Sequence, residues 1–146
     1  MNGKLSGYDF KEFVTGPIRH TNHVVKLEDI GNHVQTANGE AMFMSMYDFC
    51  EDFKDFAESK NTVAGYDGPV SISKLYFDID KGSDLDEIVK SKAVHLVHDL
   101  KVNWELDDRY IQPWFSGRGY HIVTPDFFGF TPSKTLPEEV KRTLIH

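Results

Sequence analysis

Two short segments of this sequence contain residue types that bind metal ions and phosphate. Residues 75–80 read Leu-Tyr-Phe-Asp-Ile-Asp, so a hydrophobic run ends in two carboxylates, Asp78 and Asp80. Residues 114–122 read Trp-Phe-Ser-Gly-Arg-Gly-Tyr-His-Ile and combine a hydroxyl, a guanidinium and an imidazole with two glycines. A divalent-metal site beside a phosphate-binding turn is an arrangement that supports nucleotidyl transfer.

The spacing of Asp78 and Asp80 predicts a metal site at the end of a strand. Side chains alternate across a strand, so both carboxylates project from one face. Two like charges this close repel unless a cation lies between them, and Mg²⁺ or Mn²⁺ prefers oxygen ligands. A solvated strand end has the same pattern. D-x-D also occurs in glycosyltransferases and in aspartate-nucleophile phosphatases, but the latter typically have a threonine soon afterwards, where this chain has Lys81-Gly82-Ser83.

The Ser-Gly-Arg-Gly-Tyr-His segment predicts a phosphate-binding turn between two strands. Gly117 and Gly119 let the backbone approach an anion closely, and successive N–H groups can surround it. Ser116 adds a hydroxyl donor, Arg118 can bind phosphate oxygens in a bidentate manner, and His121 opens the next strand. The alternative is a β-hairpin in which the glycines serve geometry and the arginine is solvated. A Walker loop, G-x-x-x-x-G-K-[ST], is absent from the sequence.

Composition narrows the class of protein. The 146 residues are 40% hydrophobic and 27% charged, as in an ordinary globular domain. The net charge of −7 argues against broad, non-specific nucleic-acid binding, although it allows a local basic groove. Cys50 is the single cysteine, which excludes an internal disulfide and a cysteine-based zinc site. The sequence has no apolar run of membrane-spanning length and no signal core, so we expect a cytoplasmic protein without membrane contact.

Hydrophobic periodicity and turn residues define the elements that must position the two segments. The first 39 residues predict an irregular region with a short helix at 8–14 and a strand at 23–27. Further strands are expected at 40–44, 70–80, 110–115 and 120–124. Pro113 places the third of these at an edge or bulge of a sheet. Helices are expected to begin after the capping residues Ser45, Ser83 and Thr135.

These elements predict an α+β fold, an antiparallel or mixed sheet with flanking helices, in a single domain over residues 1–146. The irregular region covers 1–39, and the core with both segments covers 40–146. The last helix has presented only Val140, Leu144 and Ile145 when the sequence stops. We therefore expect the chain to be the N-terminal part of a longer catalytic domain, incomplete at its C-terminus.

In this order, the two segments resemble those of the archaeo-eukaryotic primase superfamily, the catalytic subunits of primases and the related primase-polymerases. The resemblance rests on hydrophobic-Asp-x-Asp at residues 76–80, followed by Phe-Ser-Gly-Arg-Gly-Tyr-His at residues 115–121. The Met-Ser-Met-Tyr junction upstream and the Phe-Phe-Gly-Phe segment downstream are also similar. The resemblance extends over residues 40–130.

The resemblance implies a role for each residue of the two segments. Asp78 and Asp80 would be the catalytic residues that hold Mg²⁺ or Mn²⁺. The residues that bind the nucleotide's phosphates, or shape the loop that does so, would be Ser116, Gly117, Arg118, Gly119 and His121. The family also has a third motif with another metal-binding aspartate well downstream. This motif is not found here, and Asp126 lies too close in sequence to His121 to be a substitute.

The function that the resemblance implies is template-directed nucleotidyl transfer by a DNA primase or primase-polymerase, using two metal ions. Its partners would be nucleoside triphosphates, a DNA template or primer and other replication proteins. Three alternatives remain open from the sequence. They are a repair polymerase of the type found beside DNA ligases, a catalytically inactive fragment that binds nucleotide or template, and a sugar-nucleotide transferase with a D-x-D motif.

Overall fold

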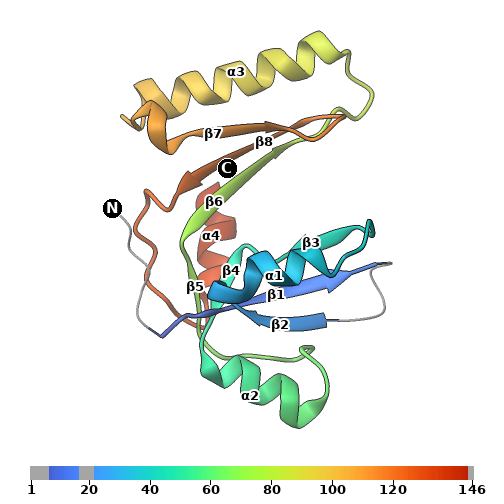
Figure 1. Ribbon diagram of the computed structural model, residues 1–146. Helices are drawn as coiled ribbons and strands as arrows, with labels where there is room; N and C mark the ends of the chain where they lie inside the picture. Colours follow the sequence, from blue (N-terminus) through green and yellow to red (C-terminus); the bar gives the residue numbers. More distant parts are fainter. Residues whose placement is uncertain (1–6, 17–21, 145–146) are drawn as a thin grey trace. The chain divides into compact units, whose positions relative to one another are not determined.

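The computed structural model describes residues 7–16 and 22–144 and has an α+β architecture of antiparallel sheets with flanking helices (Figure 1). The chain divides into two compact units. Unit 1 comprises residues up to Ser73 together with those from Gly129 onward, and unit 2 comprises Lys74–Phe128. The two segments that contain the candidate site residues, 75–80 and 114–122, both lie in unit 2. No helix within the described ranges is long and apolar enough to cross a membrane.

Unit 1 is built on a five-stranded antiparallel sheet with β1 (Phe10–Thr15) at its centre. β1 pairs with β2 (Asn22–Lys26) on one side and with β3 (Met42–Met44) and β4 (Tyr47–Phe49) on the other. β5 (Val70–Ile72) extends the sheet beyond β4. β1 belongs to the predicted irregular region 1–39, whereas β3 and β4 belong to the predicted core 40–146. One sheet therefore contains strands from both regions.

The helices of unit 1 follow its strands. The short η1 (Leu27–Asp29) leads into α1 (Ile30–Gln35), and α2 (Glu51–Lys60) follows β4. The Phe53 ring of α2 stacks on Phe49, with ring centroids 3.9 Å apart. α4 (Leu136–Leu144) packs against β5 and buries Leu136 and Val140.

The helix expected at residues 8–14 is wrong, because this segment forms β1. Phe10, Lys11 and Phe13 are all buried. Phe10 lies under Lys54 of α2, while Phe13 contacts the ring of His33 of α1. A strand that is covered on both faces has no apolar–polar alternation, so its sequence does not show a strand period.

The helix expected from Ser45 starts later, at Glu51. The Ser45 hydroxyl accepts a hydrogen bond from the Tyr47 backbone N–H at 3.1 Å, and the chain then enters β4. The aromatic spacing of this region fits a helix, but pairing with β5 favours the extended conformation for residues 47–49. Tertiary hydrogen bonds therefore override the local pattern here.

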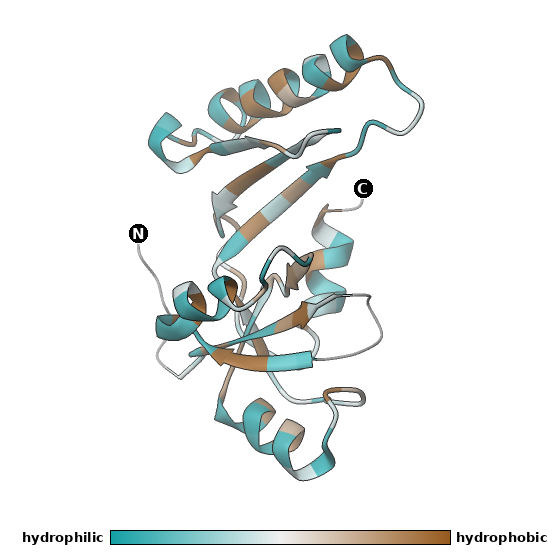
Figure 2. Ribbon diagram, turned by 45° about the vertical axis from the view of Figure 1, so that its right-hand side comes forward, coloured by the Kyte–Doolittle hydropathy of each residue, from teal (hydrophilic) through white to brown (hydrophobic). Residues whose placement is uncertain are grey.

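Unit 2 is a three-stranded antiparallel sheet covered on one face by a long helix (Figure 1). The strand order is β6 (Lys74–Ile79), β8 (Tyr120–Pro125) and β7 (Gln112–Phe115). α3 (Asp86–Val102) crosses this sheet, and the short η2 (Asp108–Tyr110) precedes β7. Apolar and polar residues alternate along β6 (Figure 2). The core between sheet and helix contains Ala93, Leu100, Ile111 and Ile122, with Phe77 and Ile79 packed against it.

Two expectations for unit 2 need correction, and one is confirmed. The single strand expected at residues 70–80 is split at Ser73 into β5 and β6, which belong to different sheets. α3 begins at Asp86 after Leu85, so Ser83 is not its N-cap. Pro113 lies in β7, an edge strand, where its missing N–H costs no sheet hydrogen bond.

The first turns of the last helix, α4, are packed against unit 1. Leu136 is fully buried and Val140 is 4% exposed, both within unit 1. Leu144 is half-buried, and Ile145 lies outside the described residues. The start of α4 is therefore held by the sheet of unit 1.

The buried ion pair between Lys11 and Asp48 gives a test of this fold. Their side chains are 7% and 5% exposed and approach to 2.8 Å, and Lys11 Nζ also donates to the Met46 carbonyl. Lys11→Met leaves a buried carboxylate without its cation, so we expect a loss of about 3–5 kcal/mol in the free energy of unfolding by urea. The double variant Lys11→Met/Asp48→Leu should recover most of this loss.

The matched control is Lys101→Met, since Lys101 pairs with Asp108 at 2.7 Å but is 42% exposed. Exposed pairs contribute less than about 1 kcal/mol. Equal losses for Lys11→Met and Lys101→Met would show that the buried pair has no special role in unit 1.

Candidate metal- and phosphate-binding site

Asp78 and His121 lie directly opposite each other on the adjacent strands β6 and β8. Residues in such a pair project from the same sheet face. The His121 Nε2 atom is 3.1 Å from Asp78 Oδ1, and the two side chains are 52% and 61% exposed. The two motifs therefore meet through a direct contact. The two segments are neighbours in one sheet and do not lie on opposite sides of a cleft.

Asp80 is the first residue after β6, at the point where the chain passes the glycine turn. The last ladder pair is Ile79 with Tyr120, so the next residues along the two chains are Asp80 and Gly119. A Cβ atom added to Gly119 would lie 2.2 Å from the Ile79 carbonyl oxygen and 3.3 Å from Asp80 Cα. Glycine is thus required at position 119, because the backbone of Ile79 and Asp80 passes too close to leave room for a side chain there.

The turn itself is held by Ser116. Its backbone N–H donates to the Gly119 carbonyl at 3.0 Å, and its hydroxyl accepts a hydrogen bond from the Gly119 N–H at 3.0 Å. Gly117 has a φ of +93°, a conformation that side chains disfavour. The Ser116 hydroxyl proton remains available to an anion, although its oxygen already stabilises the turn.

Arg118 and His121 lie in different surroundings. His121 belongs to the sheet face opposite α3, since its ladder neighbours Tyr120 and Ile122 pack toward the helix. Arg118 lines a cavity that also includes Val89 of α3 and the α3-facing Tyr120. The sequence predicts that both residues bind the same phosphates. Arg118 is part of the lining of a cavity beside the turn, and the joint role of the two residues stays a prediction.

A third strand contributes to the face that bears the aspartates. Trp114 of β7 is the ladder partner of His121, which in turn pairs with Asp78. Trp114 is 62% exposed. A row of indole, imidazole and carboxylate thus crosses the uncovered face of this sheet.

Asp126 does not join this row. It follows Pro125, the partner of Lys74 at the opposite end of the β6–β8 ladder, and so lies about 16 Å along the strand from His121. Asp126 Oδ1 accepts a hydrogen bond from the Phe128 N–H at 3.0 Å. Within residues 7–16 and 22–144, no three His, Cys, Asp or Glu side chains are grouped closely enough to hold a metal ion.

The donor set at the end of β6 nevertheless fits a hard divalent cation that keeps part of its water. The Asp78 carboxylate is exposed, Asp80 follows it at strand spacing, and both are oxygen donors. Mg²⁺ commonly takes one or two carboxylates and completes its shell with water and substrate phosphate. Asp78 and Asp80 are therefore the residues that could hold Mg²⁺ or Mn²⁺, and we expect weak binding without nucleotide.

Unit 1 contains a larger cavity of about 780 Å³, lined by residues of β2, α1 and α2. The rings of His23 and His33 lie in its wall with centroids 5.2 Å apart. Burial lowers the pKa of His33, and the nearby His23 lowers it further. The one lysine that α2 contributes, Lys54, is paired with Glu51 at 3.0 Å. This cavity has no carboxylate pair beside a glycine turn, so it does not compete with the β6–β8 site for phosphate chemistry.

Comparisons with protein-family models, with curated proteins and with solved structures give no match to this chain. The site is therefore interpreted from its own residues. Lys81, Lys90 and Phe115 line the cavity beside Arg118 and were not predicted as site residues from the sequence. The position of Lys81 directly after Asp80 could have indicated Lys81 as a site residue. Strand alternation places Phe115 on the opposite face from Trp114, which could have indicated Phe115. Lys90 has no comparable signal in the sequence.

The two glycines of the turn should differ in their tolerance of alanine. Gly119→Ala forces a Cβ onto the Ile79 carbonyl, so we expect a loss of about 3 kcal/mol in the free energy of unfolding. Gly117→Ala meets open space and only the cost of a positive φ, about 1–2 kcal/mol. Urea unfolding combined with hydrogen exchange of the β6–β8 amides measures both. Equal losses with unchanged β6–β8 protection would contradict the close approach at Gly119.

Proposed function

We propose that this chain takes part in template-directed nucleotidyl transfer, as a primase or primase-polymerase of DNA replication. The observation that supports this most directly is the placement of Asp78 opposite His121 on adjacent strands, with the glycine turn closing the same hairpin end. Metal-binding and phosphate-binding residue types thereby share one exposed sheet face. The primase resemblance of the two motifs agrees with this arrangement.

In this proposal each residue has a defined task. Asp78 and Asp80 bind Mg²⁺ or Mn²⁺, which when bound stabilises the charge on the attacking 3′-oxygen and on the pyrophosphate leaving group. Ser116 and the glycine backbone bind phosphate oxygens of the nucleoside triphosphate. The His121 Nε2 atom lies 3.1 Å from Asp78 Oδ1, so contact with the imidazole limits the orientation of the carboxylate, as partners of metal ligands commonly do.

The partners follow from the reaction. They are nucleoside triphosphates and a DNA template or primer, with other replication proteins around them. A repair polymerase would use the same residues and differs in the product that it makes. A nucleotide- or template-binding fragment without catalysis would also use them, and it lacks the third carboxylate.

The test measures binding of a nucleoside triphosphate with and without Mn²⁺, followed by incorporation of labelled nucleotide on a primed DNA template. Wild type should bind the triphosphate more tightly with Mn²⁺. Asp78→Asn should lose this metal dependence by more than about 100-fold, because it removes a charged metal ligand. Any templated incorporation should disappear in the same variant.

Asp84→Asn is the matched control, since Asp84 follows β6 in the chain and pairs with Lys92 of α3. It removes the same charge from the same unit. Wild-type binding without metal dependence, or equal effects of Asp78→Asn and Asp84→Asn, would exclude the proposed metal site. Metal-dependent binding without incorporation would favour the binding fragment over the polymerase.

A further inference from the structure

A cavity of about 380 Å³ lies on the α3 side of the glycine turn and is separate from the face that bears Asp78 and His121. Its volume falls within the usual range of ligand sites, about 300–1,000 Å³. All of its walls belong to unit 2. They are formed by the start of α3, the turn and the adjoining strand ends, through Lys81, Asp86, Glu87, Val89, Lys90, Phe115, Gly117, Arg118 and Tyr120.

An exposed aromatic ring stands at the edge of this cavity. Phe115 is 66% exposed although it sits in a strand. Its ring contacts Tyr120, its ladder partner, with centroids 5.3 Å apart, so Tyr120 holds it in place. An exposed ring supported from behind is a platform on which a nucleobase can stack.

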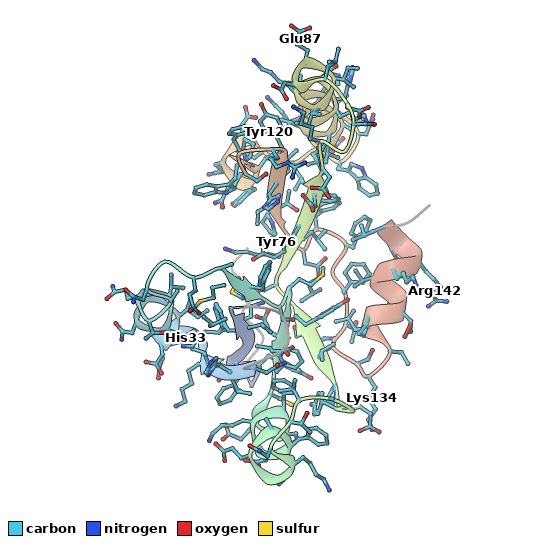
Figure 3. The ribbon with its side chains drawn as sticks, turned by 90° about the vertical axis from the view of Figure 1, so that its right-hand side faces the viewer. His33, Tyr76, Glu87, Tyr120, Lys134 and Arg142 are labelled. Carbon is cyan, nitrogen blue, oxygen red and sulfur yellow. The ribbon has the colours of Figure 1, made fainter. Side chains whose placement is uncertain are left out.

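Three cationic residues line the same cavity as this ring. Lys81, Lys90 and Arg118 all line the cavity, and Lys81 is paired with Asp86. Among the described residues, no ion pair involves Lys90 or Arg118. Glu87 is the remaining carboxylate, and in Figure 3 its side chain points away from the strands. Two side-chain cations are thus available to a ligand, in a chain whose net charge is −7.

We propose that this cavity binds single-stranded nucleic acid, with one base stacked on Phe115 and two backbone phosphates paired with Lys90 and Arg118. The choice of a strand over a free nucleotide rests on the proposed function, which requires a template close to the metal-binding residues. The lining supports it as well. Its uncharged members are Val89, Phe115, Gly117 and Tyr120, which offer stacking and packing surface and little to read a base edge.

The hairpin then has two separate tasks, one on each face. Strand alternation places Trp114 with His121 on the uncovered face and Phe115 with Tyr120 on the α3 face. A strand held at Phe115 lies one residue along β7 from Trp114, which belongs to the row that contains Asp78. The turn between them fixes their separation through its hydrogen bonds at Ser116.

The test is the binding of a fluorescein-labelled oligothymidylate to the whole chain, followed by fluorescence anisotropy in EDTA as NaCl is varied. Metal is excluded so that the site at Asp78 does not contribute. With two phosphates paired, the slope of log K against log salt should be about −1.4 for wild type and about −0.7 for Lys90→Ala. Phe115→Ala should weaken binding about tenfold with an unchanged slope, and Phe115→Trp should restore it.

The control for the charge change is Lys101→Ala, on the same helix but outside the cavity. It should leave affinity and slope at wild-type values. Equal effects of Lys90→Ala and Lys101→Ala would mean that only the general field of the helix matters, and would overturn the proposal. Displacement of the oligonucleotide by thymidine monophosphate at equal nucleotide concentration would overturn the choice of a strand.

Failure here is distinguishable from failure of the proposed function. Asp78→Asn should bind the oligonucleotide like wild type in EDTA, while Phe115→Ala and Lys90→Ala should keep Mn²⁺-dependent triphosphate binding. No oligonucleotide binding by wild type, together with intact metal-dependent triphosphate binding, would remove the strand site and leave the metal site. The reverse result would remove the metal site alone.

Discussion

The register between β6 and β8 is the constraint on which the rest of unit 2 depends. Asp78 opposes His121 only in this register, and a slip of one residue would turn His121 toward α3. Two kinds of contact specify it. Ile122 is fully buried in the core beneath α3, with Phe77 and Ile79 packed against it, so the apolar set cannot be reversed. At the other end, Gly119 admits the Ile79 carbonyl where any side chain would collide.

The same register divides the chemistry of the hairpin between two faces. Asp78, His121 and Trp114 form one row across three strands on the uncovered face. Phe115 and the turn residue Arg118 belong to the cavity beside α3. A single short turn therefore positions carboxylates and an imidazole on one side and an aromatic ring with cations on the other. Functional groups of opposite charge can lie close in the chain without neutralising one another.

Unit 2 is an insertion in the sequence of unit 1. The chain leaves unit 1 after β5 and returns to it at Gly129. Val70 and Ser133 exchange two backbone hydrogen bonds of 3.1 Å, so the outgoing and returning segments are joined. The buried Lys11–Asp48 pair and the stacked rings of Phe49 and Phe53 stabilise the sheet that supports this junction.

The sequence by itself determined the elements whose patterns are local. The alternation around Asp78, the edge position of Pro113 and the glycine turn were all predictable, because each depends on near neighbours in the chain. Tertiary structure decided the rest. β1 is covered on both faces and lacks a strand period, and β4 is extended because β5 pairs with it. Arg118 lines a cavity beside α3, whereas His121 lies on the opposite face of the sheet. These outcomes depend on partners distant in sequence, which no local pattern encodes.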